Sequence, residues 1–137
     1  MAVNPAIGLL VGGFLTPGAH VCESPPHGTL MAMASRHSRY MAQHHRQGHQ
    51  LWPSRYRELQ RVMGDKLDYR EICAESWATS AGKSHIQIGR EMFQSWQQSD
   101  GHWSIASKAH QWFGYDMHKS DTGIWYACII VAAPFDK

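Results

Sequence analysis

The chain has 137 residues, of which 43% are hydrophobic and 18% are charged. This composition suits one domain with one hydrophobic core and argues against a disordered chain. The formal net charge of +2 implies no strong electrostatic attraction to nucleic acid or to an anionic membrane surface, so we expect no nucleic-acid partner.

Residues 1–28 are rich in glycine and proline, which predicts an irregular N-terminal arm ahead of a domain that spans residues 29–137. The apolar run 6–15 has the length of a signal-peptide apolar region, but the first Lys or Arg of the chain is Arg36, so the basic leader is missing. Two interpretations stay open: a cleaved signal, and an arm that packs on the domain or on a neighbouring molecule of an assembly. No stretch approaches the roughly 20 apolar residues that cross a bilayer, so we expect no transmembrane segment.

A first helix is predicted from Thr29 to Ala42, because its apolar residues recur at the i, i+3, i+4, i+7 spacing of one helical face. Thr29 is the expected N-cap, and Gly48 is the expected stop. His37 lies on the apolar face, where we expect a core histidine bonded to the backbone, with a ligand role as the alternative. His49 follows the stop directly.

A second helix over residues 54–63 is predicted from Pro53, which suits a first turn, and from Gly64 beyond its end. Its inner face is mixed and includes Arg55. The residues that follow, 65–70, are expected to form a loop.

Residues 71–78 alternate as a short β-strand, with Cys73, Glu75 and Trp77 on one face. Glu75 therefore lies between two apolar neighbours, and buried carboxylates are scarce unless they are paired or functional. The alternative interpretation is an edge strand with Glu75 in water.

The three cysteines are Cys22, Cys73 and Cys128, and none belongs to a Cys-x-x-Cys motif, so no thiolate zinc site is predicted. Cys73 and Cys128 both lie on predicted strands. A disulfide between them, which leaves Cys22 free, and three buried thiols both stay open.

The segment 84–87 matches the capping box and predicts a third helix that runs to about Gln97. Residues 112–118 are expected to form a strand and 119–123 a turn. Residues 124–132 are β-branched and aromatic and long enough for a central strand, so the last two strands should form an antiparallel hairpin.

Between these elements, the segment 93–103 closes on Gly101-His102, which Trp96 and Trp103 flank. Gly101 frees the backbone to turn, so we expect His102 on a loop against a large aromatic surface. Taken alone, this histidine is either a site residue or an aromatic-stacked surface residue.

Four positions then stand out: His49 after the first helix, Glu75 on a strand, and Ser99 and His102 after the third helix. Their order and spacing resemble the CAP superfamily (cysteine-rich secretory, antigen 5 and pathogenesis-related proteins), specifically its compact bacterial form with an SCP-like domain. The segments that carry the resemblance are Ala34 to Ala42, Gly48-His49, Cys73 to Ala78, Trp96 to Ile105, Phe113-Gly114-Tyr115 and Trp125 to Ala132.

Two positions depart from the family's pattern. Ala74-Glu75-Ser76 stands where the family usually has Gly-Glu-Asn, and Ser99 takes the place of a second acidic residue that many eukaryotic members have. The missing acidic group reduces the charge balance and the general-base options of a catalytic site.

The resemblance implies an α+β fold, a three-layer α-β-α sandwich with a small, mainly antiparallel sheet, and a cleft where two histidines and acidic groups converge. There, His49 and His102 would bind zinc or another divalent metal ion, with Glu75 as a direct ligand or as the partner that fixes a histidine tautomer. Without a metal, Glu75 and a histidine would form an acid–base pair, with Ser99 a nearby hydroxyl. No serine lies in a recognisable nucleophile elbow, which argues against a serine hydrolase.

Two functions follow. The first is a binding or structural module of an extracellular, cell-envelope or particle assembly (secreted or viral), with a metal ion or a small lipid or peptide ligand in its cleft and protein partners at its N-terminal arm. The second is a metal-assisted peptidase whose catalytic residues are His49, Glu75 and His102. We favour the binding module, because proteolysis is not a general property of the CAP family, and enzymatic activity stays undecided.

Overall fold

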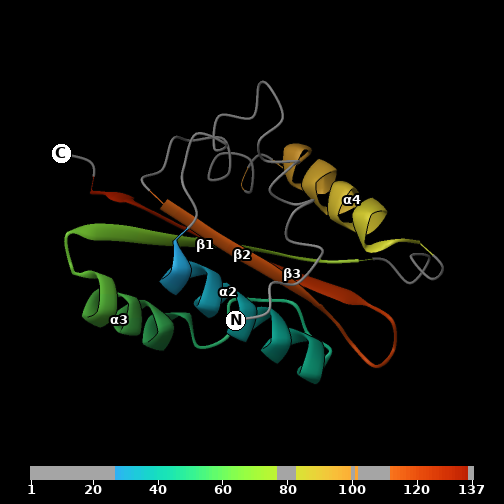
Figure 1. Ribbon diagram of the computed structural model, residues 1–137, viewed down its shortest axis with the longest axis horizontal. Helices are drawn as coiled ribbons and strands as arrows, with labels where there is room; N and C mark the ends of the chain where they lie inside the picture. Colours follow the sequence, from blue (N-terminus) through green and yellow to red (C-terminus); the bar gives the residue numbers. More distant parts are fainter. Residues whose placement is uncertain (1–26, 77–82, 100, 102–111, 136–137) are drawn as a thin grey trace.

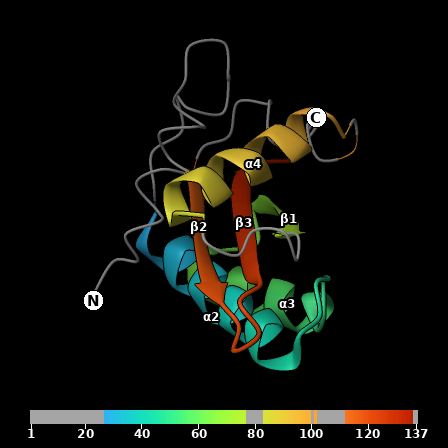
Figure 2. The same ribbon diagram turned by 90° about the vertical axis from the view of Figure 1, so that its right-hand side faces the viewer.

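The computed structural model describes residues 27–76, 83–99, 101 and 112–135. In this part of the chain a small sheet lies between two helical layers, with α4 on one face and α2 and α3 on the other (Figures 1 and 2). The elements in chain order are α2 (Gly28–His44), α3 (Trp52–Met63), β1 (Leu67–Glu75), α4 (His85–Gln97), β2 (Trp112–Lys119) and β3 (Trp125–Pro134). The predicted α+β sandwich is confirmed.

The three described strands have the order β1-β3-β2, and both pairings are antiparallel. β3 is therefore central, as its length and composition predicted, and β2 and β3 form the expected hairpin. None of the described helices combines the length and the apolar character that crossing a bilayer requires.

Alternate residues of the strands supply two hydrophobic cores, one on each face of the sheet. On β3, Ala127, Ile129 and Val131 face α4, whereas Cys128, Ile130 and Ala132 face α2 and α3. The inner stripe predicted for the third helix is confirmed at the residues whose side chains are described, Ile88, Met92 and Trp96. The capping box at Ser84 and Gln87 is also present.

The first helix begins and ends differently from the prediction. Its N-cap is His27, whose Nδ1 accepts a hydrogen bond from the backbone N–H of Thr29 at 3.1 Å. Its C-cap is His45, in the left-handed conformation with φ 52°, so the helix stops three residues before Gly48. A neutral imidazole offers an acceptor nitrogen for the first position, and histidine is among the non-glycine residues enriched in the left-handed region for the second.

β1 begins at Leu67, inside the stretch 65–70 that was predicted as a loop. The charged residues Asp68 and Arg70 alternate with buried Leu67 and Tyr69, so this part of the strand is amphipathic rather than irregular. Pairing with β3 from Leu67↔Pro134 onward provides the backbone hydrogen-bond partners that override the polar composition. The strand ends at Glu75, and residues 77 and 78 of the predicted strand lie outside the described residues.

The start of α2 crosses the edge strand β2 at Gly114. The N–H of His27 donates to the carbonyl of Phe113 at 2.9 Å, and the N–H of Tyr115 donates to Sδ of Met31 at 3.3 Å. A β-carbon built on Gly114 would lie 2.2 Å from backbone atoms of Leu30 and Met31, so only glycine allows this approach. Among the described residues, the crossing covers the outer edge of β2.

We expect Gly114→Ala to lower the free energy of unfolding by at least about 1–3 kcal/mol, the typical cost of overpacking. The cost arises because backbone atoms, rather than a flexible side chain, must move to admit the new β-carbon. Urea unfolding followed by circular dichroism measures this change. Gly28→Ala is the matched control, since a β-carbon there meets nothing within 4 Å. Equal stability of the two variants would contradict the proposed close crossing.

Candidate functional site

The most concentrated group of ionisable side chains in the described residues surrounds Glu71 on β1. The Glu71 side chain is 1% exposed, on the sheet face that α2 and α3 cover. Its Oε1 accepts from His49 Nδ1 at 2.9 Å and from Arg55 Nη2 at 2.9 Å, and its Oε2 accepts from Arg55 Nη1. Arg55 is itself buried, so the two residues form a bidentate ion pair that is shielded from solvent.

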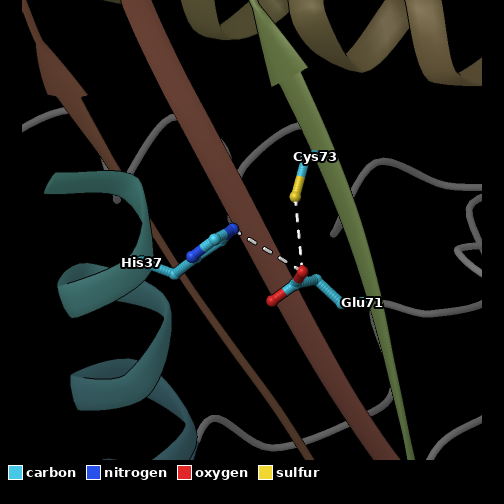
Figure 3. A group of neighbouring side chains, drawn as sticks. All are labelled: His37, Glu71 and Cys73. Carbon is cyan, nitrogen blue, oxygen red and sulfur yellow. Dashed lines mark hydrogen bonds and ion pairs between the residues drawn. The ribbon is translucent and has the colours of Figure 1, made fainter. Parts of the chain in front are cut away.

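Each partner comes from a different element. His37 comes from α2, His49 from the connection between α2 and α3, and Arg55 from the first turns of α3. Cys73 follows Glu71 by two positions on β1, which places both on the same face of the strand. In Figure 3 the ring of His37 and the sulfur of Cys73 point toward the carboxylate of Glu71.

His37 is held by the backbone. Its Nε2 lies 2.7 Å from the carbonyl of Gly48, 3.2 Å from Arg55 Nη2 and 3.7 Å from Glu71 Oε1. A carbonyl only accepts hydrogen bonds, so the proton of the ring lies on Nε2 and is directed at Gly48. The expected core histidine bonded to backbone is thus present, and a metal ion could use Nε2 only by displacing that proton.

The charges of the group stabilise one another. Burial alone would raise the pKa of Glu71, but hydrogen bonds from Arg55 and His49 and the charge of Arg55 lower it from 4.5 to about 2. Hydrogen bonds first with Cys73 and then with Glu71 raise the pKa of His49 to about 10. At neutral pH, Glu71 is a carboxylate and His49 an imidazolium.

The two thiols of this region differ in acidity. A hydrogen bond with Cys128 lowers the pKa of Cys73 to about 5, against the opposing effect of burial, and the two histidines add to the lowering. Burial, followed by the hydrogen bond with Cys73, raises the pKa of Cys128. Cys73 is therefore the more acidic of the two thiols, although the neighbouring carboxylate of Glu71 opposes its ionisation.

Three of these residues offer ligand atoms at distances that suit a metal ion. The ligand atoms of His37, Glu71 and Cys73 all lie within 4.8 Å of one another, and Oε1 of Glu71 is 3.7 Å from His37 Nε2 and 3.6 Å from Cys73 Sγ. Ligand atoms bonded to a tetrahedral zinc at 2.0–2.3 Å are about 3.3–3.8 Å apart. The group could therefore hold a metal ion, and Arg55 Nη2, close to both His37 and Glu71, supplies the positive charge in its place.

The structure places the predicted site residues as follows. His49 belongs to the Glu71 group, with 54% of its side chain exposed. Glu75 is exposed at the end of the edge strand β1, which is the alternative interpretation of that residue, and the carboxylate that His49 contacts is Glu71. Ser99 is half-buried just after α4, where its N–H donates to the carbonyl of Trp96 at 3.2 Å. His102 lies outside the described residues.

Sequence reasoning missed Glu71 and the role of Arg55. A usable signal was present, because the helical spacing placed Arg55 on the inner face of its helix, and a buried arginine requires an anionic partner. Glu71 lies on the same face of β1 as Cys73 and Glu75, and it is the acidic residue that lies under α3. Treating 65–70 as a loop put Glu71 at a strand end, where a charge needs no explanation.

A second polar group under α2 has the residue types of a hydrolytic triad. Ser38 Oγ lies 2.7 Å from His118 Nδ1, and His118 Nε2 lies 4.0 Å from Asp116 Oδ2. However, Ser38 Oγ donates to the carbonyl of Ser35 at 3.0 Å, so His118 donates to the serine instead of accepting its proton. Ser38 is fully buried, so this hydroxyl is structural.

Comparison with known proteins addresses the fold. No family model matches the sequence. No curated protein matches it either. Among solved structures, the chain is similar to an outer surface protein from Borrelia burgdorferi, with a TM-score of 0.72 and 13% sequence identity over 98% of this chain and 97% of that one. At this identity the likeness establishes a shared fold, and the function has to be argued from the site.

The lowered pKa of Glu71 predicts how stability depends on pH. The carboxylate stabilises the folded protein fully above about pH 4.5, and this contribution is lost as the pH falls toward 2. The difference between the ordinary pKa of 4.5 and the pKa of about 2 in the folded protein corresponds to about 3 kcal/mol of unfolding free energy. We expect the stability difference between wild type and Glu71→Gln to shrink by this amount between pH 5 and pH 2, measured by urea unfolding at each pH.

The control for this titration is Glu58→Gln, which removes an exposed ion pair with Arg36. Its effect should stay within about 1 kcal/mol at every pH, since surface ion pairs contribute little. A wild-type curve parallel to that of Glu71→Gln from pH 5 to pH 2 would show that the Glu71 carboxylate is not stabilised by its partners.

Proposed function

We propose that this chain is a CAP-like binding module of an extracellular, cell-envelope or particle assembly, and that its buried group of His37, Glu71 and Cys73 holds a zinc ion. The observation that carries the metal is the convergence of these three ligand atoms within 4.8 Å. Imidazole, thiolate and carboxylate together are a donor set typical of zinc.

Membership of the CAP family is supported by the order of motifs along the sequence and by the α-β-α sandwich that this resemblance implied. The location is supported by the fold shared with a protein described as an outer surface protein. Protein partners at the N-terminal arm are part of this proposal and rest on the composition of residues 1–28.

Binding of zinc requires Arg55 to move. Its Nη2 lies 2.9 Å from Glu71 Oε1 and 3.2 Å from His37 Nε2, close to where the ion would contact both residues. A cavity of about 250 Å³ adjoins this point and is lined by His37 and Arg55 together with Arg36, Tyr40, Gln50, Leu51, Ser54 and Glu58. It offers the guanidinium a place to swing into and offers an ion a path from solvent.

The size of that cavity also bears on the ligand class. Pockets for organic ligands typically enclose about 300–1,000 Å³, so this one suits an ion with its water better than a lipid. Within the described part of the chain, Oε1 of Gln50, which lines the cavity, is the one buried side-chain polar atom without a hydrogen-bond partner. An unpaired acceptor favours a polar occupant.

A metal-assisted peptidase at His49, Glu75 and His102 is the second candidate. It is favoured by the exposure of the His49 side chain, since a substrate must reach the catalytic group. It is disfavoured because the carboxylate that His49 contacts is the buried Glu71, whereas Glu75 is exposed at the end of β1. Cleavage of a peptide library by wild type but not by Glu75→Gln would select it over the binding module.

The metal proposal predicts that the reduced protein binds one zinc ion, measured by competition with a chromophoric chelator in a Cys22→Ser background that removes a stray thiol. His37→Ala should bind at least about tenfold more weakly, because it loses a ligand. His44→Ala is the matched control on the same helix, since His44 is exposed and its Nδ1 contacts the carbonyl of Tyr40.

Arg55→Met should bind zinc more tightly than wild type, because the competing cation is gone, provided that circular dichroism shows the variant to be folded. If His37→Ala binds zinc as wild type does, the buried site is refuted. If only His49→Ala, Glu75→Gln and His102→Ala lose zinc, the ion lies in the cleft expected from sequence.

A further inference from the structure

Cys73 and Cys128 are directly opposite each other on the antiparallel strands β1 and β3. Both are buried free thiols, 2% and 0% exposed. Opposed residues of an antiparallel pair point to the same face of the sheet, and both sulfurs belong to the core under α2 and α3.

The hydrogen bonds of the sheet identify the type of this pair. The N–H of Ser76 donates to the carbonyl of Trp125 at 2.8 Å, which makes that pair, one step beyond Glu75↔Tyr126, a hydrogen-bonded one. Hydrogen-bonded and non-hydrogen-bonded pairs alternate along an antiparallel ladder. Counting back three positions, Cys73↔Cys128 is non-hydrogen-bonded.

The carbonyl of Cys73 supports the same assignment. It accepts hydrogen bonds from the side chains of Gln47 at 3.3 Å and Trp96 at 3.2 Å, so it points away from β3. In an edge strand, a residue whose carbonyl points outward is the non-hydrogen-bonded partner of the residue opposite.

This pair type brings the two cysteines within disulfide range. Cα atoms of non-hydrogen-bonded pairs are about 4.5 Å apart, and disulfides span Cα separations of about 4.4–6.8 Å. The sulfurs also meet the same carboxylate: Cys73 Sγ is 3.6 Å from Oε1 of Glu71, and Cys128 Sγ is 3.4 Å from Oε2. The separation typical of this pair type thus lies within the disulfide range, at its short end.

We propose that Cys73 and Cys128 are an oxidisable pair that forms a reversible disulfide across β1 and β3, with hydrogen peroxide or another small hydroperoxide as the oxidant. Cys73 Sγ attacks one oxygen of the peroxide and the O–O bond breaks. Cys73 becomes a sulfenic acid, and the other oxygen leaves as water with the thiol proton. Cys128 Sγ then attacks the sulfur of Cys73, the S–O bond breaks, and a second water leaves with the thiol proton. Two thiols and one hydrogen peroxide give one disulfide and two waters.

Access favours a small oxidant. Cys73 Sγ lies 3.5 Å from the carbonyl of Gly48 and 3.9 Å from Nδ1 of His49, and the exposed side chain of His49 leads from this point to the surface. The short segment at Gly48 and His49 is thus the cover over the sulfur. A bulky disulfide oxidant would have to displace this cover, whereas a peroxide needs only a small opening.

Oxidation would also regulate the metal site. This consequence, unlike the disulfide itself, rests on the proposed zinc function, because a sulfur in a disulfide no longer serves as a thiolate ligand. The oxidised protein should therefore lose zinc binding, and reduction with dithiothreitol should restore it.

The disulfide is tested in the Cys22→Ser background, in native buffer with hydrogen peroxide, followed by alkylation in denaturant and digestion with trypsin without reduction. Cleavage at Lys and Arg gives one peptide with Cys73, residues 71–83, and one with Cys128, residues 120–137. We expect mass spectrometry to find these two peptides joined, two hydrogen masses below their sum, and separate after reduction.

Cys73→Ser and Cys128→Ser are the controls and should each abolish the joined peptide. The proposal is overturned if both thiols of the oxidised protein remain alkylatable, if they advance to sulfinic acid without joining, or if joined peptides appear only in dimers on a non-reducing gel. Zinc binding of the reduced protein is measured separately, so a protein that forms the disulfide but binds no zinc refutes the metal function and retains the disulfide.

Discussion

The buried ion pair between Glu71 and Arg55 constrains much of this structure. Removing a carboxylate from water costs several kcal/mol, and only complete hydrogen bonding offsets this cost. Both oxygens of Glu71 are used by Arg55, and one also by His49, so the first turns of α3 and the connection before it are tied to the middle of β1. The position of α3 over the sheet edge follows from this requirement.

The same requirement organises the neighbouring side chains. His37 joins α2 to the group through the carbonyl of Gly48, and Cys73 and Cys128 each direct a sulfur at one oxygen of Glu71. In the resulting group, both oxygens of Glu71 have hydrogen-bond partners while Arg55 is in place. If the proposed zinc site is occupied, the ion and the guanidinium compete for one position, and Arg55 then decides whether the site is structural or binds metal.

The fold was largely predictable because it depends on periodic signals. The helical spacing of residues 29–42, the capping box at Ser84 and the β-branched run in β3 each indicated their element and, for β3, its central place. The predicted ends of the first helix were wrong because of local chemistry. The imidazole of His27 caps the start of α2, and His45 in the left-handed conformation ends it.

The site was less predictable, because it depends on which residues meet across elements. His49, predicted from sequence as a site residue, lies beside Glu71, and His37 was placed correctly on the inner face of its helix. Glu71 was not identified, since the polar start of β1 resembled a loop, and Glu75 drew attention instead. Glu71 and Glu75 lie on the same face of the strand, so alternation alone allows either to be the buried carboxylate. Only the three-dimensional position of Arg55 distinguishes them.

The central claim is that Glu71 and Arg55 stabilise the protein as a pair, and a double-mutant cycle tests it most directly. Urea unfolding of wild type, Glu71→Gln, Arg55→Met and the double variant gives the coupling energy. Each single change should cost about 3–5 kcal/mol, because it leaves a buried partner without its counterpart. The double variant should cost at least about 2 kcal/mol less than the sum of the two. Additivity of the two changes within about 0.5 kcal/mol would contradict the account.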